Sequence, residues 1–342
     1  MKAFQLLQHG QPGTFQLVET VRPTPASDEV QVEVKACGLN RLDLWVEEGA
    51  LPVPVSLPRV LGGEVAGVIA ELGADVEDWR RGERVAVQSN LFCGSCEYCL
   101  RGDESICLRG ELLGVQRDGG FQEFVNVPAR ALVRLPDEID YASSAALTLA
   151  GSTAMHMLAR RAEVRSSDWV LVIAGASGVG TYAIQIARQL GARVIATGST
   201  AAKREFARQM GANVVLDSSD ENWAAGVREA TGKRGVDLVV EHVGGSTFEK
   251  CLGCLARGGT IVTCGATAGR EAALNLWPFF VKEQRVIGSY GRTRADIEAV
   301  LEWARYGKIR PVVHQTFPLA RTAEAFALLR SRAVLGKVVV SV

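Results

Sequence analysis

Residues 170–180 read VLVIAGASGVG, and this stretch decides the fold. Four apolar residues run into a turn that contains Gly175, Gly178 and Gly180, and apolar residues then recur at helical spacing over 179–190. Glycines between a buried strand and a helix let the backbone approach a pyrophosphate group at the helix N-terminus. The stretch therefore predicts a strand–turn–helix unit that binds a dinucleotide.

One position departs from the dinucleotide fingerprint, because Ser177 stands where the middle glycine is expected. A glycine turn that only permits tight packing is the alternative interpretation. The strand, the helix and the further βα units around the turn supply the context that a nucleotide site requires. The residues of the turn that we expect to bind the cofactor are Gly175, Ser177, Gly178, Val179 and Gly180.

Outward from the turn, buried strand patterns alternate with helical patterns. The predicted strands are 169–174, 193–196, 214–215, 238–240 and 260–263, and the predicted helices between them are 181–190, 202–210, 223–230 and 248–255. This alternation predicts an α/β domain with a doubly wound parallel sheet over 150–289. Residues 1–149 carry short alternating β-branched runs between glycines and prolines, which is typical of an antiparallel β domain. Residues 290–342 add helices at 295–306 and 322–331 and a strand at 337–342.

Composition excludes several classes of protein. The 342 residues carry 38 Lys+Arg and 38 Asp+Glu, so no overall charge draws the chain to nucleic acid or to an anionic membrane. No apolar run approaches the roughly 20 residues of a membrane helix, and the first ten residues show no secretory leader. We therefore expect a cytoplasmic protein, in which the 8 cysteines serve as metal ligands or buried thiols.

The second predicted strand of the nucleotide domain ends without an acidic residue. Enzymes that prefer NADH usually place Asp or Glu there to hold the ribose hydroxyls, whereas this chain has Ser199, followed by Lys203 and Arg204. A hydroxyl and two cations suit a 2′-phosphate. We therefore expect NADPH as the cofactor. The alternative is that Lys203 and Arg204 only form the solvated face of a helix.

Four cysteines cluster within a short segment, at Cys93, Cys96, Cys99 and Cys107. Two-residue separations let successive thiolates turn toward one ion, and four thiolates complete a closed tetrahedral shell around Zn²⁺. Such a shell leaves no open position for a substrate, so we expect one structural zinc per chain, held by a lobe over about 90–110. An iron–sulfur cluster and a redox-active cysteine pair are the alternatives.

Five features follow one another along the chain. They are residues 35–43 (KACGLNRLD), 61–67 (LGGEVAG), the four-cysteine lobe, 119–124 (GGFQEF) and the glycine turn. Together they resemble the medium-chain dehydrogenase/reductase superfamily, specifically a zinc-containing alcohol dehydrogenase-like member. The resemblance implies a GroES-like catalytic domain completed by the C-terminal segment, a Rossmann domain between them, and an active site in the cleft. It also implies that Val243 and Gly265 touch the cofactor, and that a homodimer, or a tetramer, pairs strands near 272–276.

Departures from this family pattern bear on the chemistry. Members with a catalytic zinc hold it with a cysteine, with the histidine of a Gly-His-Glu motif, and with a third cysteine or acid. The corresponding positions here are Asn40, Gly63 and Leu149, none of which can bind zinc as that mechanism requires. A displaced metal site through Glu64 and His156 is the alternative, although His156 also fits a helical core position.

Without that metal, the resemblance favours reduction of a quinone or an α,β-unsaturated carbonyl compound by NADPH. The alternatives are a zinc-dependent alcohol dehydrogenase with displaced ligands and a nucleotide-binding or redox-sensing protein without turnover. We expect Asn40, Asp43 and Thr153 to serve the reaction. The competing interpretations are a structural hydrogen-bond acceptor for Asp43 and a helix cap for Thr153. The segments expected to select the small-molecule substrate are Trp45, 51–59 and 277–281.

Overall fold

The glycine turn follows a central strand of a six-stranded parallel sheet. In spatial order the strands are β13 (Val214–Asp217), β12 (Arg193–Gly198), β11 (Trp169–Val172), β14 (Val236–Glu241), β15 (Leu255–Thr263) and β16 (Arg285–Gly288). The strand order reverses between β11 and β14, so the carboxyl ends of these two strands form a topological switch point. This arrangement confirms the predicted doubly wound α/β domain.

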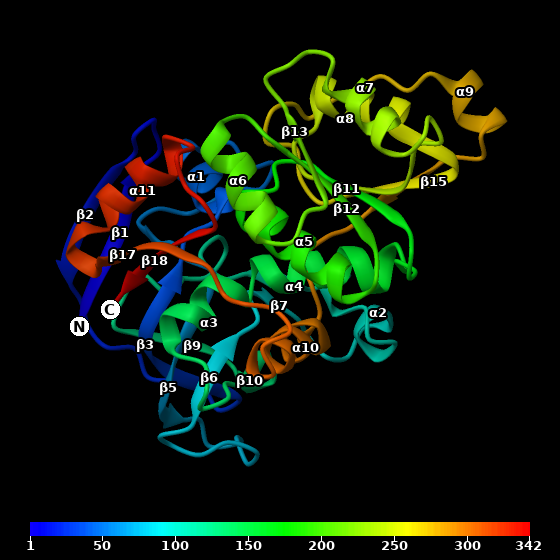
Figure 1. Cartoon of the computed structure of the whole chain (residues 1–342). Helices are drawn as coiled ribbons and strands as arrows, with labels where there is room; N and C mark the ends of the chain where they lie inside the picture. Colours follow the sequence, from blue (N-terminus) through cyan, green and yellow to red (C-terminus); the bar gives the residue numbers. More distant parts are fainter. The chain divides into compact units, whose positions relative to one another are not determined.

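Helices cover both faces of this sheet (Figure 1). They are α5 (Gly178–Gln189), α6 (Ala201–Gln209), α7 (Trp223–Ala230) and α8 (Gly245–Cys254), preceded by the π-helical turn η3 (His156–Arg161). A further short helix, α9 (Leu276–Val281), has no buried residue. Because βαβ crossovers are right-handed, α5 and α6 pack on one face, and α7 and α8 pack together on the other. Leu171, Val239 and Cys251 belong to a buried core between the sheet and the second pair of helices.

The edge of the parallel sheet differs from the prediction. Residues 272–276 were expected to supply the edge strand, but they form no strand, and α9 begins at Leu276. The edge strand is β16, which the hydrophobic pattern did not reveal. It has only four residues, and three of them are exposed, so burial imposes no period on it.

The structure is a computed structural model that describes residues 1–342, and they divide into two units. Unit 1 comprises Met1–Ser152 and Arg292–Val342, and unit 2 comprises Thr153–Gly291. The first boundary passes through α4 (Ala150–Met155), a few residues after the predicted domain limit. None of the helices combines the length and the apolar character needed to cross a membrane.

Unit 1 is built on a mainly antiparallel sheet. Its strands, in order, are β10 (Leu132–Arg134), β6 (Arg84–Val87), β5 (Glu64–Leu72), β3 (Glu29–Gly38), β18 (Lys337–Ser341) and β17 (Val313–Pro318), with β9 (Phe124–Pro128) also paired to β3. Smaller sheets join β2 (Thr14–Glu19), β1 (Lys2–Gln8) and β4 (Arg59–Val60), and β7 (Asn90–Leu91) with β8 (Glu111–Leu112). The helices of unit 1 are α1 (Arg41–Glu48), α2 (Glu97–Leu100), α3 (Tyr141–Leu147), α10 (Arg294–Arg305) and α11 (Thr322–Arg330), with 3-10 turns at Glu104–Ile106, Ala129–Ala131 and Leu319–Arg321.

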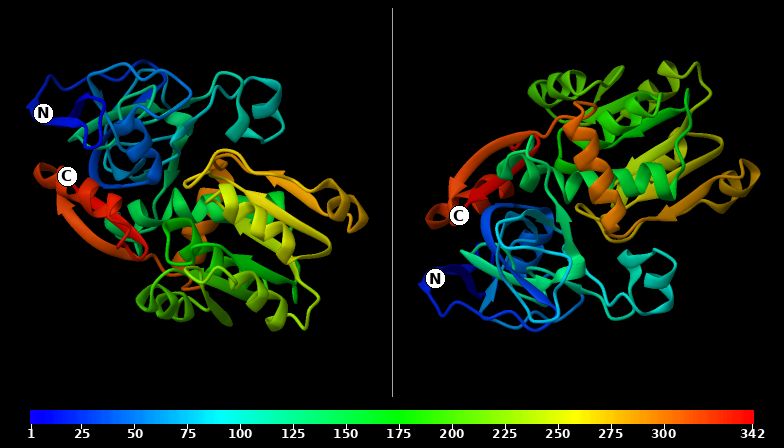
Figure 2. Two further views of the ribbon diagram at one scale, coloured as in Figure 1. Left: turned by 90° about the horizontal axis from the view of Figure 1, so that it is seen from above. Right: turned by 90° about the horizontal axis from the view of Figure 1, so that it is seen from below.

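The C-terminal segment returns to the N-terminal β domain, and Figure 2 shows the red C-terminal elements beside the blue ones. Strand β18 pairs antiparallel with β3, with Val340 opposite Cys37. The ring of Phe326 on α11 lies 4.9 Å from that of Phe15, which stacks on Phe4 at 5.0 Å. This return places Lys337, at the start of β18, beside the end of β3.

Candidate active site and zinc lobe

Two of the predicted catalytic residues lie where β3 ends and α1 begins. Asn40 is the N-cap of α1, and its backbone N–H donates to Asp43 Oδ2 at 2.7 Å. The backbone N–H of Gly62 donates to Asp43 Oδ1 at 3.1 Å. Burial raises the pKa of the Asp43 carboxyl to about 6, against the opposing effect of these two N–H groups and of Lys337. These contacts favour the structural interpretation of Asp43, since each of its oxygens fixes a backbone segment.

A buried ion pair lies beside Asn40. Lys337 Nζ donates to Glu64 Oε2 at 2.8 Å, to Asn40 Oδ1 at 2.5 Å and to the Leu39 carbonyl at 2.5 Å. Asn40 Nδ2 donates to Glu64 Oε2 at 3.0 Å and to the Gly38 carbonyl at 3.3 Å. Both ends of the Asn40 amide are therefore engaged inside unit 1. Its contacts suit a residue that positions this polar cluster.

The second oxygen of Glu64 is also engaged. Glu64 Oε1 accepts from the backbone N–H of Leu149 at 2.6 Å and of Ala150 at 3.4 Å. With an ammonium and an amide on one oxygen and two N–H groups on the other, the carboxylate is already fully coordinated by the protein. A metal ion at Glu64 would have to displace Lys337 or the backbone N–H groups of Leu149 and Ala150.

The position of the family's histidine ligand offers little room for a side chain. A Cβ atom added to Gly63 would lie 3.1 Å from the Leu113 carbonyl oxygen and 3.3 Å from Ser89 Cβ. Both separations are tighter than ordinary van der Waals contact, so a larger residue would require its neighbours to shift. The packing around Gly63 therefore agrees with the sequence, which has glycine and not a zinc-binding histidine at this position.

Thr153 and His156 both lie on the segment that follows. Thr153 is inside α4, which begins at Ala150, so the competing interpretation of Thr153 as a helix cap was wrong. The Thr153 side chain is 7% exposed, and its catalytic role remains a prediction. His156 begins η3 and is buried, which favours the core interpretation of this histidine.

The four cysteines of the lobe face one another. Their ligand atoms all lie within 4.8 Å, with Sγ–Sγ distances of 3.9 Å for Cys93–Cys99, 3.5 Å for Cys96–Cys99 and 3.8 Å for Cys96–Cys107. Four sulfurs about 2.3 Å from one zinc ion lie about 3.8 Å apart in a tetrahedron. The donor set therefore fits a structural zinc, and it is the one group of three or more candidate ligands in the chain.

Backbone and side-chain donors reach two of the sulfurs, those of Cys93 and Cys107. The Ser95 backbone N–H donates to Cys93 Sγ at 3.5 Å, and Arg109 Nη2 donates to the same sulfur at 3.3 Å. These donors lower the pKa of Cys93 to about 5. The Arg109 backbone N–H donates to Cys107 Sγ at 3.4 Å. Donors aimed at ligand sulfurs are the outer contacts that orient a metal site.

The predicted nucleotide turn has the geometry of a phosphate cradle in unit 2. Ser177 is the N-cap of α5, and its Oγ accepts from the Gly180 N–H at 3.0 Å. A Cβ atom at Gly180 would lie 2.3 Å from the Ala174 carbonyl oxygen, so this turn requires glycine there. Gly175 is similarly enclosed by Ala196 and by the helix. Tight backbone packing at the start of α5 suits the close approach of a pyrophosphate.

The residues expected to bind a 2′-phosphate follow β12. Ser199 is exposed, and Lys203 Nζ lies 3.5 Å from Ser199 Oγ. Arg204 instead pairs with Asp217 of β13 at 2.6 Å and donates to the Gly198 carbonyl at 3.3 Å. Arg204 is thus held against the sheet, and Ser199 with Lys203 forms the more accessible part of the predicted site.

A buried carboxylate that sequence analysis missed shapes the loop after β14. Glu241 is fully buried, and its Oε1 accepts from the N–H groups of Val243 and Gly244, each at 2.7 Å. An acidic residue directly after the apolar run 238–240 was the available signal. The loop places His242 beside Gly265, where an added Cβ would lie 3.0 Å from the His242 carbonyl oxygen. The cofactor contacts expected of Val243 and Gly265 remain predictions.

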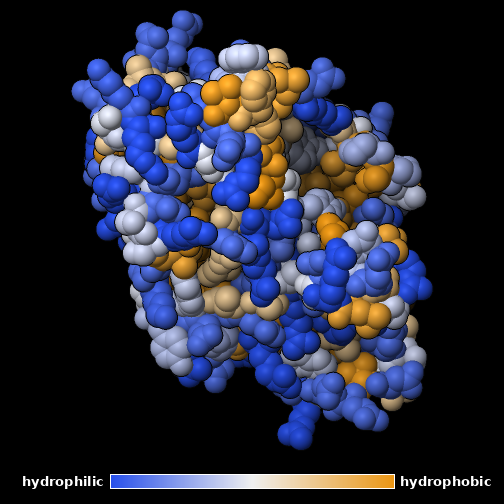
Figure 3. Space-filling view, turned by 90° about the vertical axis from the view of Figure 1, so that its right-hand side faces the viewer, coloured by the Kyte–Doolittle hydropathy of each residue, from blue (hydrophilic) through white to orange (hydrophobic).

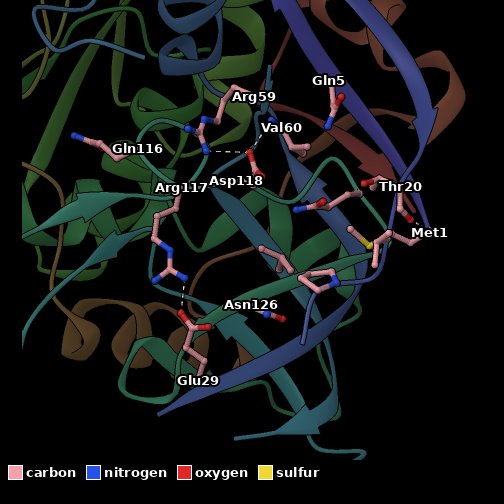
Figure 4. Close-up of a pocket in the computed structure, with 14 residues that line it drawn as sticks. Met1, Gln5, Thr20, Glu29, Arg59, Val60, Gln116, Arg117, Asp118 and Asn126 are labelled. Atoms are coloured by element: carbon pink, nitrogen blue, oxygen red, sulfur yellow. Dashed lines mark hydrogen bonds and ion pairs between the residues drawn. The ribbon is translucent and has the colours of Figure 1, made fainter. Parts of the chain in front are cut away.

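A separate cavity lies on unit 1, and Figure 4 shows its polar lining. It measures about 430 Å³ and includes Arg59 and Arg117. Asp118 pairs with Arg59 at 3.0 Å, and Glu29 pairs with Arg117. None of the predicted catalytic, cofactor-binding or metal-ligating residues lines it, and both arginines are neutralised by carboxylates, so we assign it no ligand.

Comparison with known proteins agrees with this geometry. The zinc-binding dehydrogenase family model matches residues 178–305, and the alcohol dehydrogenase GroES-like domain model matches residues 26–137. An alcohol dehydrogenase of Geobacillus stearothermophilus is 32% identical over 344 residues, and an acryloyl-coenzyme A reductase of Metallosphaera sedula is 31% identical over 342 residues; each alignment covers 100% of both chains. A solved NAD-dependent alcohol dehydrogenase is 37% identical with a TM-score of 0.96, again over 100% of both chains.

The β-rich unit, the nucleotide turn and the four-thiolate lobe define a nucleotide-dependent oxidoreductase of two units. The chain belongs to the medium-chain dehydrogenase/reductase superfamily, among its alcohol dehydrogenase-like members. This confirms the resemblance and the GroES-like and Rossmann domains that it implied. Membership of this family makes the chain an oxidoreductase, which speaks against the alternative of a nucleotide-binding protein without turnover.

Proposed function

We propose that the protein uses NADPH to reduce a quinone or an α,β-unsaturated carbonyl compound, such as an enoyl thioester, without a catalytic zinc. The hydrogen bonds and the ion pair of the Glu64 carboxylate are the observation that carries this proposal. Both of its oxygens are occupied, by Lys337, Asn40 and the backbone N–H groups at the start of α4. Asn40, Gly63 and Leu149 replace the family's zinc ligands. The similarity to an acryloyl-coenzyme A reductase supports the class of substrate.

Such a reduction needs no Lewis acid to acidify an alcohol. The turn over 175–180 would hold the reduced dinucleotide, which would supply the hydride for the β carbon, while solvent would supply the proton for the α carbon. The chain's own contribution is to bind and to orient. The turn over 175–180 holds the phosphates, Ser199 and Lys203 select the 2′-phosphate, and Asn40 is held in one orientation by Lys337 and Glu64.

Zinc content and substrate range test the proposal together. Protein purified without chelators should contain one zinc per chain and oxidise NADPH faster with enoyl thioesters, enones or quinones than it reduces NADP⁺ with alcohols. NADPH should bind more tightly than NADH in a fluorescence titration. Two zinc ions per chain with activity only toward alcohols or aldehydes would establish a zinc-dependent alcohol dehydrogenase and overturn the proposal.

We also propose that two copies of the chain pair through the free edge of the Rossmann sheet. On the face of the molecule drawn in Figure 3, hydrophobic residues gather toward the top of the view. The side chains that form the apolar patch are Leu274, Leu276, Trp277, Phe280, Val281 and Val286, each 40–71% exposed. An apolar patch beside an unpaired edge strand is a common site of association, and antiparallel pairing of β16 with its copy would extend the sheet about a two-fold axis.

Replacing Val286 by lysine should convert the dimer to a monomer, because the charge would face the same charge on the partner strand. Light scattering after size-exclusion chromatography measures the mass. Val21→Lys, at a valine of unit 1 that is 86% exposed, is the control and should leave the mass unchanged. A wild-type chain that runs as a monomer at micromolar concentration would refute the proposed dimer.

A further inference from the structure

Ser177 and His242 meet at the topological switch point of the Rossmann sheet. Ser177 follows β11 and caps α5, and His242 is the first residue after β14. Ser177 Oγ lies 3.0 Å from His242 Nε2, and the Gly180 N–H donates to the same oxygen at 3.0 Å. Open α/β sheets bind their ligands at the carboxyl ends of the strands beside such a switch point.

The surroundings of His242 decide where its proton lies. The residue is 9% exposed, and its side-chain Nδ1 is buried without a hydrogen-bond partner. Burial lowers the pKa of the imidazole to about 4, so the ring is neutral near pH 7 and carries one proton. A buried N–H without an acceptor is rarer than an acceptor without a donor. We therefore place the proton on Nε2, which donates to Ser177 Oγ.

This assignment fixes the direction of the Ser177 hydroxyl. A hydroxyl oxygen offers two acceptor sites and one donor. The N–H of Gly180 and the Nε2–H of His242 fill both acceptor sites. The hydroxyl hydrogen must therefore point away from both, and Ser177 is half-buried at the N-terminus of α5, where it can still be reached by a ligand. That end of a helix favours an anion.

We propose that His242 is a positioning residue that directs the Ser177 hydroxyl toward the pyrophosphate of the bound dinucleotide. The hydroxyl supplies a donor at the position where the fingerprint's middle glycine offers only backbone. The inference rests on the proposed nucleotide dependence, and it adds a specific hydrogen bond and the residue that orients it. His242 acts only through Ser177, because its own second nitrogen is buried.

The affinity for nucleotide tests whether the Ser177 hydroxyl contributes a hydrogen bond to the pyrophosphate. The full-length protein is titrated with NADPH, and bound nucleotide is followed by its fluorescence. Ser177→Gly restores the glycine of the fingerprint and should raise the Kd about tenfold, as expected for loss of a hydrogen bond to a charged group. Thr181→Val is the matched control, because the Thr181 hydroxyl bonds only the Ser177 carbonyl within α5, at 2.7 Å. It should leave the Kd unchanged.

Variants of His242 test the positioning role. His242→Leu should weaken NADPH binding several-fold in the wild-type background and have no effect in the Ser177→Gly background. His242→Gln can present an amide N–H where Nε2–H was and should restore most of the affinity. A structural role for the histidine would instead weaken binding equally in both backgrounds, and that result would overturn the inference.

The imidazole proton is observable directly. Nitrogen-15 NMR of labelled histidine should show the Nε2–H tautomer for His242, and the Nδ1–H tautomer would overturn the proposal. A Ser177→Gly variant that binds NADPH like the wild type would also overturn it while leaving the proposed function intact. Failure of the wild-type chain to bind NADPH or NADH would overturn both.

Discussion

Replacing Lys337 by methionine is expected to lower the thermal midpoint of unit 1 by about 10 °C. The Lys337 and Glu64 side chains are 3% and 0% exposed, so removing the ammonium leaves a carboxylate charge buried without its partner. Breaking a buried ion pair in this way costs about 3–5 kcal/mol. A loss of that size shifts the midpoint of a domain of this length by about 10 °C. Differential scanning calorimetry resolves the effect even if the two units unfold separately.

Two controls separate burial of the charge from loss of the lysine side chain. Lys35→Met makes the same change at an ion pair with Glu33, whose side chains are 35% and 42% exposed, and should shift the midpoint little. The double variant Lys337→Met with Glu64→Gln removes the uncompensated charge but keeps an oxygen for the Leu149 N–H. It should recover at least half of the lost stability. A midpoint unchanged by Lys337→Met alone would contradict a buried ion pair.

The fold could be predicted where burial imposes a period on the sequence. The helix predicted at 223–230 is α7, and the five predicted strands of the nucleotide domain all exist within a few residues. Strand β16 was not predicted, because three of its four residues are exposed. The segment expected to pair was therefore placed at 272–276 instead. An edge strand with few buried side chains leaves little pattern to recognise.

The candidate site was predictable only in its local parts. Asn40 followed three residues later by Asp43, just before a helical pattern, is a capping signal, and that arrangement was found. The partner of Glu64 could not be inferred, because Lys337 reaches it only through the pairing of β18 with β3. The Ser177–His242 contact likewise depends on the neighbouring positions of β11 and β14. Contacts of this kind follow from topology, which a hydrophobic pattern does not encode.

Replacing Cys99 by serine is expected to remove the zinc and unfold the cysteine lobe. The lobe has little apolar core of its own, since Leu100, Ile106 and Leu108 are 76%, 45% and 66% exposed. Its order must therefore come largely from the metal, and structural zinc contributes about 10 kcal/mol or more to the folding of zinc-finger peptides. The zinc content measured by elemental analysis should fall from about one zinc per chain to none. Trypsin should then cleave after Arg101 or Arg109 at least about tenfold faster, because local unfolding exposes the backbone.

The outcome for the rest of the molecule distinguishes a structural metal from a catalytic one. The nucleotide turn and the lobe belong to different units, so Cys99→Ser should bind NADPH with the affinity of the wild type. Cys251→Ser changes a fully buried thiol of the Rossmann core and should keep its zinc, which shows that the loss is specific to the lobe. If Cys99→Ser retained one zinc per chain, the four-thiolate assignment would be wrong. If it lost the zinc but kept its resistance to trypsin, the lobe would be stabilised by its own packing, and the exposed leucines argue against that result.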